Sequence, residues 1–375
     1  MDFSGFDVGP SDQTPPVCQQ ASRSFVPKIP TVFILVDRSG SMFDTIPGTT
    51  TNAWNSLRGG VLQVISDLQA DVRFGFGAFS GGGGVCPEMP MIAPALDNHD
   101  AISALYSPLQ YDTRYKDTPT LAALSKAATT LWSDSVEGDK YILYVTDGEP
   151  DYCDDGNALC PPDSVVGQLQ KLALGLDATG AQQAPIHTLV FGVKSPLANV
   201  RPETLQAFAN AGAGQPVAPP LTNGTTSDPN AVWDQCNGVP GWMQYFATTG
   251  KPATRGQTTA NYDTTGANGT AAVYRPDPND QAALIGQIQT ALAGVKSCSF
   301  DLAGDGVKVD LARPDLGTLA HVLINGAAVP FDANNGWHMA SETTVALEGA
   351  ACASWRVPGQ TAISFDFPCD VIVLR

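Results

Sequence analysis

Apolar residues in the first three quarters of the chain fall into short continuous runs separated by stretches with helical spacing. The runs predict strands at 31–36, 71–79, 140–145 and 186–193, with a short edge strand at 270–274. Recurrence at i, i+3 and i+4 predicts helices at 52–68, 97–105, 117–132, 163–178, 202–211 and 280–292. Strands that are apolar throughout and alternate with helices indicate an α/β fold, with a doubly wound, mainly parallel sheet covered on both faces.

From Cys298 onward the hydrophobic period changes to two, which is typical of half-buried strands. Short alternating runs at 307–311, 321–324, 327–331, 344–347, 362–367 and 371–374 are separated by turn residues, and Asn325-Gly326 is a strong hairpin signal. We therefore predict three parts. These are an extended arm at 1–28, an α/β domain at 29–296 with an insertion at about 212–269, and a small all-β domain at 297–375.

Acidic residues outnumber basic residues by 37 to 20, which gives a formal net charge of −17. Such a field repels nucleic acids and anionic membrane surfaces, so both are excluded as expected partners. Eight dispersed cysteines without a Cys-x-x-Cys pair indicate disulfides rather than a zinc site. Proximity suggests pairing Cys153 with Cys160 and keeping Cys298, Cys352 and Cys369 local, but eight cysteines leave the connectivity open.

The sequence contains no apolar run of membrane-spanning length and no N-terminal signal peptide. Disulfide-type cysteines without such a signal suggest a chain from which an export signal has been removed. A secreted or cell-surface location, such as the bacterial outer membrane or the extracellular space, is therefore expected.

Oxygen-bearing side chains gather at the predicted strand ends. Asp37, Ser39 and Ser41 follow the first strand two residues apart, Thr118 begins a helix, and Asp147 follows the strand at 140–145. Open α/β sheets bind ligands at the carboxyl ends of their strands. Two carboxylates and three hydroxyls are hard oxygen ligands that suit Mg²⁺, Mn²⁺ or Ca²⁺.

These motifs resemble those of a von Willebrand factor A (vWA) domain with its metal-ion-dependent adhesion site (MIDAS). The matching stretches are DRSGSM, DTPT and VTDGEP, within a strand and helix order that agrees across roughly residues 29–295. The resemblance implies that Ser39, Ser41 and Thr118 contact the metal directly. It also implies that Asp37 and Asp147 hold the metal through water or by moving into direct contact.

One position departs from the vWA pattern. Asp117 precedes Thr118 where small or glycine residues are common, and its charge favours Ca²⁺ or weakens anion binding. The expected cation is therefore Mg²⁺ or Ca²⁺, with Mn²⁺ also suitable.

The whole chain also resembles secreted or lipid-anchored bacterial proteins of the myxobacterial type, in which an A domain precedes a small cysteine-bearing β module. The stretches that carry this similarity are IQTALAGVKSCSF, LINGAAVPF, NNGWHM, LEGAAC and FDFPCDVIVL. This resemblance implies export, with a lipid anchor at the cell surface as a further expectation.

Together these observations predict a binding module, and not an enzyme, in which the cation captures an acidic side chain of a protein partner. The 212–269 insertion and the 151–162 loop would contribute to specificity. A subunit of a surface or envelope assembly is an alternative. A metal-assisted hydrolase is a weaker alternative, because the only candidate bases are Glu149 and the group Asp151, Asp154 and Asp155, and because no nucleophile motif is present.

Overall fold

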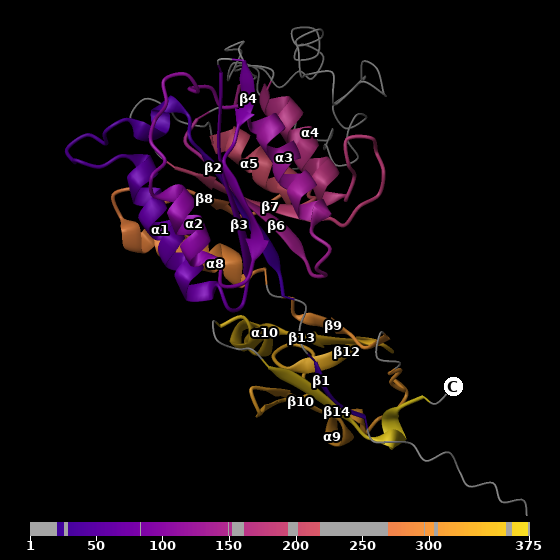
Figure 1. Cartoon of the computed structure of the whole chain (residues 1–375). Helices are drawn as coiled ribbons and strands as arrows, with labels where there is room; N and C mark the ends of the chain where they lie inside the picture. Colours follow the sequence, from indigo (N-terminus) through magenta and orange to yellow (C-terminus); the bar gives the residue numbers. More distant parts are fainter. Residues whose placement is uncertain are drawn as a thin grey trace, which may run out of the picture. The chain divides into compact units, whose positions relative to one another are not determined.

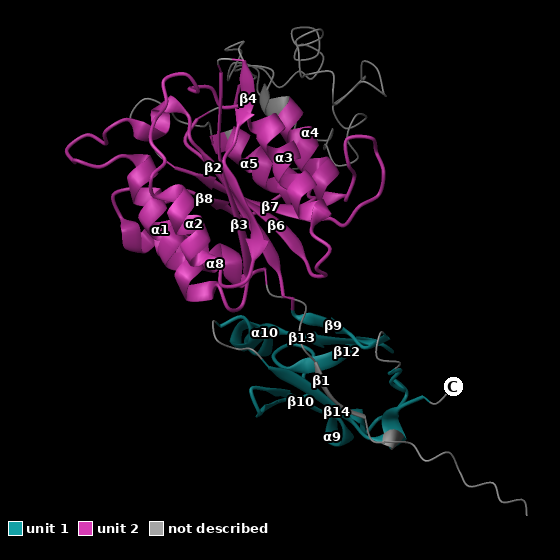
Figure 2. Ribbon diagram, in the orientation of Figure 1, with its two compact units in different colours: residues 1–27, 298–375 teal, residues 28–297 magenta. Residues whose placement is uncertain are grey.

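The computed structural model divides the chain into two compact units. One consists of residues 28–297 and the other of residues 1–27 together with 298–375 (Figure 2). The described residues are 21–25 (backbone only), 29–82, 84–148, 150–151, 161–193, 202–217, 269–295, 297–303, 307–357 and 362–373. Most of the predicted 212–269 insertion and of the 151–162 loop, with Glu149, Asp154 and Asp155, therefore lies outside the described residues.

The larger unit alternates strands with helices. In chain order its elements are β2 (Thr31–Asp37), η1 (Gly40–Phe43), α1 (Ala53–Leu68), β3 (Arg73–Gly82), β4 (Val85–Glu88), β5 (Met91–Ala95), α2 (His99–Tyr106), α3 (Thr120–Ser133), β6 (Lys140–Thr146), α4 (Pro161–Ala173), β7 (Ile186–Gly192), α5 (Pro202–Gly212), β8 (Val273–Tyr274) and α8 (Gln281–Ala293). Each predicted strand and helix of this unit has a counterpart.

These strands form one sheet in the order β4-β3-β2-β6-β7-β8, with β5 also paired to β3. The five strands from β3 to β8 are parallel, and β4 and β5 pair antiparallel to β3. The predicted doubly wound, mainly parallel sheet is thus confirmed. Parallel pairing brings the carboxyl ends of β2, β3, β6 and β7 to one edge.

Helices cover both faces of this sheet, with α1, α2 and α8 on one face and α3, α4 and α5 on the other (Figure 1). Every residue of β2 is buried, and its side chains alternate between the two layers. Val32 and Val36 pack under α1, whereas Phe33 and Leu35 pack under α3. Burial on both faces explains why the strand is apolar throughout.

The smaller unit contains two antiparallel sheets, β1-β14-β10-β11 and β12-β13-β9. Its elements are β1 (Ala21–Phe25), β9 (Ser299–Asp301), α9 (Leu316–Leu319), β10 (His321–Ile324), β11 (Ala327–Val329), β12 (Trp337–Ser341), β13 (Thr344–Leu347), α10 (Gly349–Trp355), β14 (Ile363–Phe367) and η4 (Cys369–Val371). The Phe300 and Phe365 rings meet between the sheets at 5.3 Å. A disulfide joins Cys298, immediately before β9, to Cys352 in α10. Both belong to the group of cysteines expected to pair locally, within which the connectivity was left open.

The N-terminal arm supplies a strand to this unit. Ala21–Phe25 pairs antiparallel with Ile363–Phe367 near the other end of the chain. The small unit is consequently assembled from both ends of the sequence, and the α/β unit is an insertion between its first two strands. The arm at 1–28 was predicted only as extended, without a pairing partner.

Two predictions in the α/β unit need correction. In the sequence, the run Ser80-Gly-Gly-Gly-Gly lacks the Gly-Lys-Ser/Thr of a phosphate loop and is interpreted as a flexible connector. In the structure β3 continues through Gly82 and pairs antiparallel with β4. The helix predicted at 163–178 ends at Ala173. Gly175 has a φ of +69°, a conformation that ends a helix and that glycine adopts without strain.

Two strands predicted in the β unit are wrong. Val309 makes only an isolated bridge to Ile372, and Val371 ends the 3₁₀ helix η4. The predicted strand at 327–331 stops at Val329. The strand β12 and the helix α10 were not predicted.

Candidate metal centre

The two predicted carboxylates lie at the ends of adjacent parallel strands. Asp37 is the last residue of β2, and Asp147 follows β6 directly, and both are fully buried. The turn after Asp37 reaches Asp147, because the Ser41 hydroxyl donates a hydrogen bond of 2.9 Å to Asp147 Oδ1. The register of β2 with β6 therefore places residues 110 positions apart in sequence at one point of the sheet edge.

Ser39 and Ser41 lie on a tight turn at residues 37–41, here called the serine turn. Ser39 caps η1 and Ser41 lies within it, so that their hydroxyl oxygens are 3.3 Å apart. The Ser39 N–H donates to Asp37 Oδ1 at 2.7 Å, which closes an Asx turn over the strand end. The Asp-x-Ser-x-Ser spacing thus directs three oxygen-bearing side chains toward one region.

Thr118 lies on the neighbouring loop, immediately before α3. That loop is attached to the serine turn by a hydrogen bond of 3.3 Å from the Gly40 N–H to the Lys116 carbonyl. The Thr118 N–H donates to Asp151 Oδ1 at 2.8 Å, and the Asp151 N–H donates to the Thr118 carbonyl at 3.0 Å. Asp151 therefore ties Thr118 to the segment that follows β6, four residues beyond Asp147.

The Asp37 carboxyl is held by neutral donors. Its Oδ2 accepts a 2.7 Å hydrogen bond from the Thr146 hydroxyl. Burial raises the pKa of Asp37, while the hydrogen bonds from Thr146 and Ser39 act in the opposite direction. A bound cation would offset the cost of keeping this buried carboxylate charged.

The donor set fits a hard divalent cation. Two buried carboxylates and the hydroxyls of Ser39, Ser41 and Thr118 supply only oxygen. Across the residues that the structure describes, no group of three or more His, Cys, Asp and Glu side chains could hold a metal. A cation here would consequently depend on hydroxyl oxygens as well as carboxylates.

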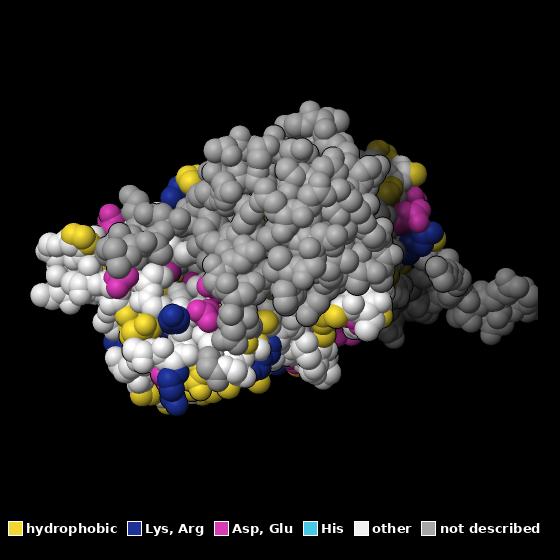
Figure 3. All heavy atoms as spheres, turned by 90° about the horizontal axis from the view of Figure 1, so that it is seen from above, with side chains coloured by type: hydrophobic (Ala, Val, Ile, Leu, Met, Phe, Trp, Pro, Cys, Tyr) yellow, Lys and Arg dark blue, Asp and Glu magenta, His cyan; other side chains and the backbone are white. Residues whose placement is uncertain are grey.

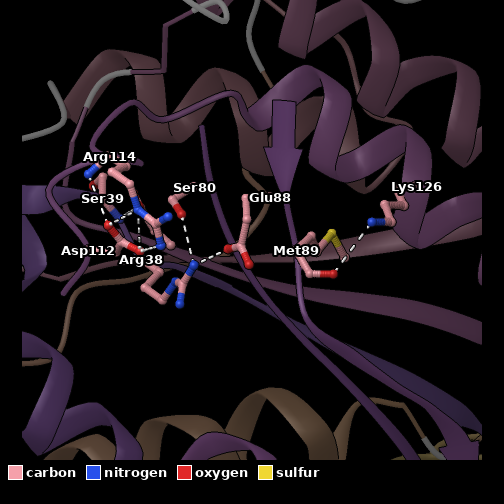
Figure 4. Close-up of polar contacts among 9 residues, drawn as sticks. Arg38, Ser39, Ser80, Glu88, Met89, Asp112, Arg114 and Lys126 are labelled. Atoms are coloured by element: carbon pink, nitrogen blue, oxygen red, sulfur yellow. Dashed lines mark hydrogen bonds and ion pairs between the residues drawn. The ribbon is translucent and has the colours of Figure 1, made fainter. Parts of the chain in front are cut away.

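An arginine next to the predicted ligands was missed by the sequence analysis. Arg38 is only 6% exposed, forms an ion pair with Glu88 on β4 and donates to the Ser80 hydroxyl at 3.3 Å (Figure 4). This contact connects the serine turn to the β3–β4 hairpin. The sequence feature that could have indicated this role is a long charged side chain within an otherwise small and polar stretch, Asp37-Arg38-Ser39-Gly40-Ser41.

A second missed feature is the segment Ser107–Asp117, which borders the serine turn. A methyl group built on Gly40 would lie 3.1 Å from the Tyr111 hydroxyl oxygen, so the tyrosine packs directly against this glycine. Tyr111 also contacts Phe43, with the ring centroids 5.5 Å apart.

In the view from above, acidic and basic side chains are interspersed on the part of the surface that the structure describes (Figure 3).

The parallel strands and the alternating helices agree with the fold that the vWA resemblance implies. That resemblance is confirmed at the level of the fold. No protein-family model matches the chain, and no curated protein has a significant match.

Several solved structures are similar to the chain. The pilus adhesin SpaC from Lactobacillus rhamnosus GG is 13% identical with a TM-score of 0.43, and the match covers 91% of this chain and 39% of the adhesin. The SpRpn10 VWA domain is 11% identical, with a TM-score of 0.34 and coverage of 49% and 82%. Manganese-loaded TRAP from Plasmodium vivax is 16% identical, with a TM-score of 0.33 and coverage of 52% and 66%.

Proposed function

We propose that this protein is an adhesion-type binding module in which a divalent cation captures an acidic side chain of a protein partner. The cation, Mg²⁺ or Ca²⁺ with Mn²⁺ also suitable, would be held by Asp37, Ser39, Ser41, Thr118 and Asp147. When bound, it supplies a positive centre that accepts a carboxylate oxygen from outside.

The observation that carries this proposal is the 2.9 Å contact between the Ser41 hydroxyl and Asp147 Oδ1. It joins the first and last of the three motifs at the carboxyl edge of the sheet, where open α/β folds bind ligands. With Asp37 and Ser39 in the same hydrogen-bonded cluster, the donors are positioned before any ligand arrives.

The experiment is a set of thermal melts of the whole protein in Mg²⁺, Ca²⁺, Mn²⁺ and EDTA. A ligand that binds only the folded state stabilises it by RT ln(1 + [L]/Kd), about 2.7 kcal/mol at a hundred times Kd. We expect at least one cation to raise the Tm of the α/β unit, and Asp147→Asn to abolish that increase.

Asp139 provides a matched control, because it is exposed and precedes the same strand β6 at its other end. Asp139→Asn makes the same chemical change, yet the cation-induced increase in Tm should persist. Equal melts in EDTA and in all three cations would contradict the proposed function.

We extend the proposal to the location of the protein, which we place at a cell surface or outside the cell. The Cys298–Cys352 disulfide and a disulfide at Cys86 support an oxidising compartment. Among the helices of the described ranges, none has the length and apolar character needed to cross a membrane.

A further inference from the structure

The Ser107–Asp117 segment is fixed beside the proposed cation site. Its C-terminal end pairs with β3, because the Gly81 N–H donates to the Asp117 carbonyl at 3.1 Å and the Asp117 N–H donates to the Gly81 carbonyl at 3.0 Å. The Gly40–Lys116 hydrogen bond joins it to the serine turn. Side chains on this segment are therefore held near the position where the proposed cation site would bind an acidic group of the partner.

Arg114 is the prominent exposed group of the segment, with a side chain that is 72% exposed. Asp112 orients it through hydrogen bonds from Nε to Oδ1 at 3.0 Å and from NH2 to Oδ2 at 2.6 Å (Figure 4). The guanidinium also lies over the Tyr115 ring, 5.1 Å from its centroid. These three contacts restrict the side chain to one orientation before a ligand binds.

Asp112 does not use all the capacity of Arg114. A guanidinium carries five N–H donors in a fixed plane, and the hydrogen bonds from Nε and NH2 to Asp112 use one edge of that plane. The hydrogen bonds from Arg114 lower the pKa of Asp112 to about 2, so the Asp112 carboxylate stays charged well into the acidic range. The opposite edge of an exposed guanidinium can donate hydrogen bonds to a second carboxylate.

Charge supplies a reason for such a contact. A chain with a net charge of −17 repels an acidic partner at long range. One cation that is itself surrounded by carboxylates compensates little of this repulsion. A positioned arginine at the rim adds a second local attraction, which acts only on ligands with an acidic group at the right spacing.

We propose that Arg114 is a specificity-determining residue and that the partner segment carries two acidic side chains. The cation site binds one of them and Arg114 binds the other, while Tyr111, which is 41% exposed, contacts the chain between them. This inference rests on the proposed function, since it assigns the second acidic group to a rim residue of the same site.

The test uses the whole protein and capped synthetic glycine peptides, with NMR titration to measure Kd in Mg²⁺ and, in parallel, in Ca²⁺, Mn²⁺ and EDTA. One peptide carries a single Asp, and the others carry two Asp residues separated by zero to three glycines. We expect the two-Asp peptide with the best spacing to bind roughly tenfold more tightly than the single-Asp peptide. Arg114→Gln should remove this gain and leave the single-Asp affinity within about twofold.

Arg313 offers a matched control, because it is clasped by Asp315 in the smaller unit in the same way, with Nε to Oδ1 at 2.9 Å and NH2 to Oδ2 at 3.0 Å. Arg313→Gln changes the net charge equally, and it should preserve the tenfold difference.

The outcomes separate the two claims. If all peptides bind in Mg²⁺ but not in EDTA, and a second Asp or Arg114→Gln makes no difference, the inference is wrong and the proposed function stands. An equal loss for both peptide types on Arg114→Gln also contradicts it, because that pattern indicates a general charge or folding effect. If no peptide binds in any cation, the proposed function fails and the inference fails with it.

Discussion

At the scale of single residues, the serine turn separates neighbours with opposite charges. Asp37 is directed into the proposed cation site, whereas Arg38, one residue later, extends to Glu88 and Ser80. Burying a guanidinium is costly unless a partner carboxylate accepts its hydrogen bonds. Glu88 therefore stabilises the turn by keeping the charge of Arg38 paired.

We expect Glu88→Gln to lower the free energy of unfolding of the α/β unit by about 2 kcal/mol, because it leaves Arg38 charged and nearly buried. Urea denaturation followed by tryptophan fluorescence measures the change. Glu342 is the control, because it forms an ion pair with Lys308 in which both side chains are substantially exposed. Glu342→Gln should cost less than about 1 kcal/mol. Equal losses for the two variants would show that the burial of Arg38 is energetically unimportant.

The sequence revealed the predicted ligands but not their supports. Asp37, Ser39 and Ser41 are close in sequence and follow a recognisable strand, so their proximity could be predicted. The Arg38–Glu88 pair joins residues 50 positions apart across a hairpin that was interpreted as a flexible connector. Similarly, nothing local shows that Tyr111 packs on Gly40, because this contact depends on how the Ser107–Asp117 segment folds back.

At the scale of elements, the β10–β11 hairpin was predicted correctly from two residues. Asn325 and Gly326 have φ values of +46° and +82°, as a tight two-residue hairpin turn requires. The twist of such a turn matches that of the flanking strands, which fixes the pairing of Ile324 with Ala327. Local turn chemistry was enough to predict this element.

We expect Gly326→Ala to lower the free energy of unfolding of the β unit by about 1–2 kcal/mol, because a side chain at positive φ is strained. Open space surrounds the position, so steric contact adds nothing. Gly286 in α8 is the contrasting case, since a methyl group there also meets open space but the backbone is helical. Gly286→Ala should stabilise the α/β unit by about 0.5–1 kcal/mol. A loss of stability in both variants on chemical denaturation would contradict this explanation.

The strands that were wrongly predicted have a different cause. The runs at 307–311 and 371–374 have alternating apolar residues, and within their described residues they meet at one isolated bridge, between Val309 and Ile372. Two backbone hydrogen bonds of 2.8 Å flank it, from the Asp310 N–H to the Val371 carbonyl and from the Val373 N–H to the Lys308 carbonyl. Alternation records which side chains are buried, and Val309 and Val371 are indeed fully buried. It does not record how far the pairing between two segments continues, which tertiary packing decides.

At the scale of the whole molecule, the two units have separate hydrophobic cores. The β unit is small, and its Cys298–Cys352 disulfide closes a loop with a sequence separation of 54. A cross-link over such a loop stabilises the folded state by restricting the unfolded chain, with a value of about 4 kcal/mol in the chain-entropy model. The α/β unit has two large hydrophobic layers.

We expect the double variant Cys298→Ala/Cys352→Ala to lower the Tm of the β unit strongly and to leave the Tm of the α/β unit within about 2 °C, since the units have separate cores. Differential scanning calorimetry should resolve two transitions, of which only the one assigned to the β unit moves. A parallel decrease of both transitions would show instead that the units unfold together.

The pairing of β1 with β14 has a consequence for biosynthesis. Ile363–Phe367, the partner of Ala21–Phe25 in the sheet, is synthesised more than 300 residues after it. At typical rates of translation, the intervening α/β unit has tens of seconds in which to fold. During that time the first strand has no native neighbour and an unpaired edge. Its central sequence, Ser22-Arg23-Ser24, is polar and charged, which disfavours aggregation with other chains before the partner strand is synthesised.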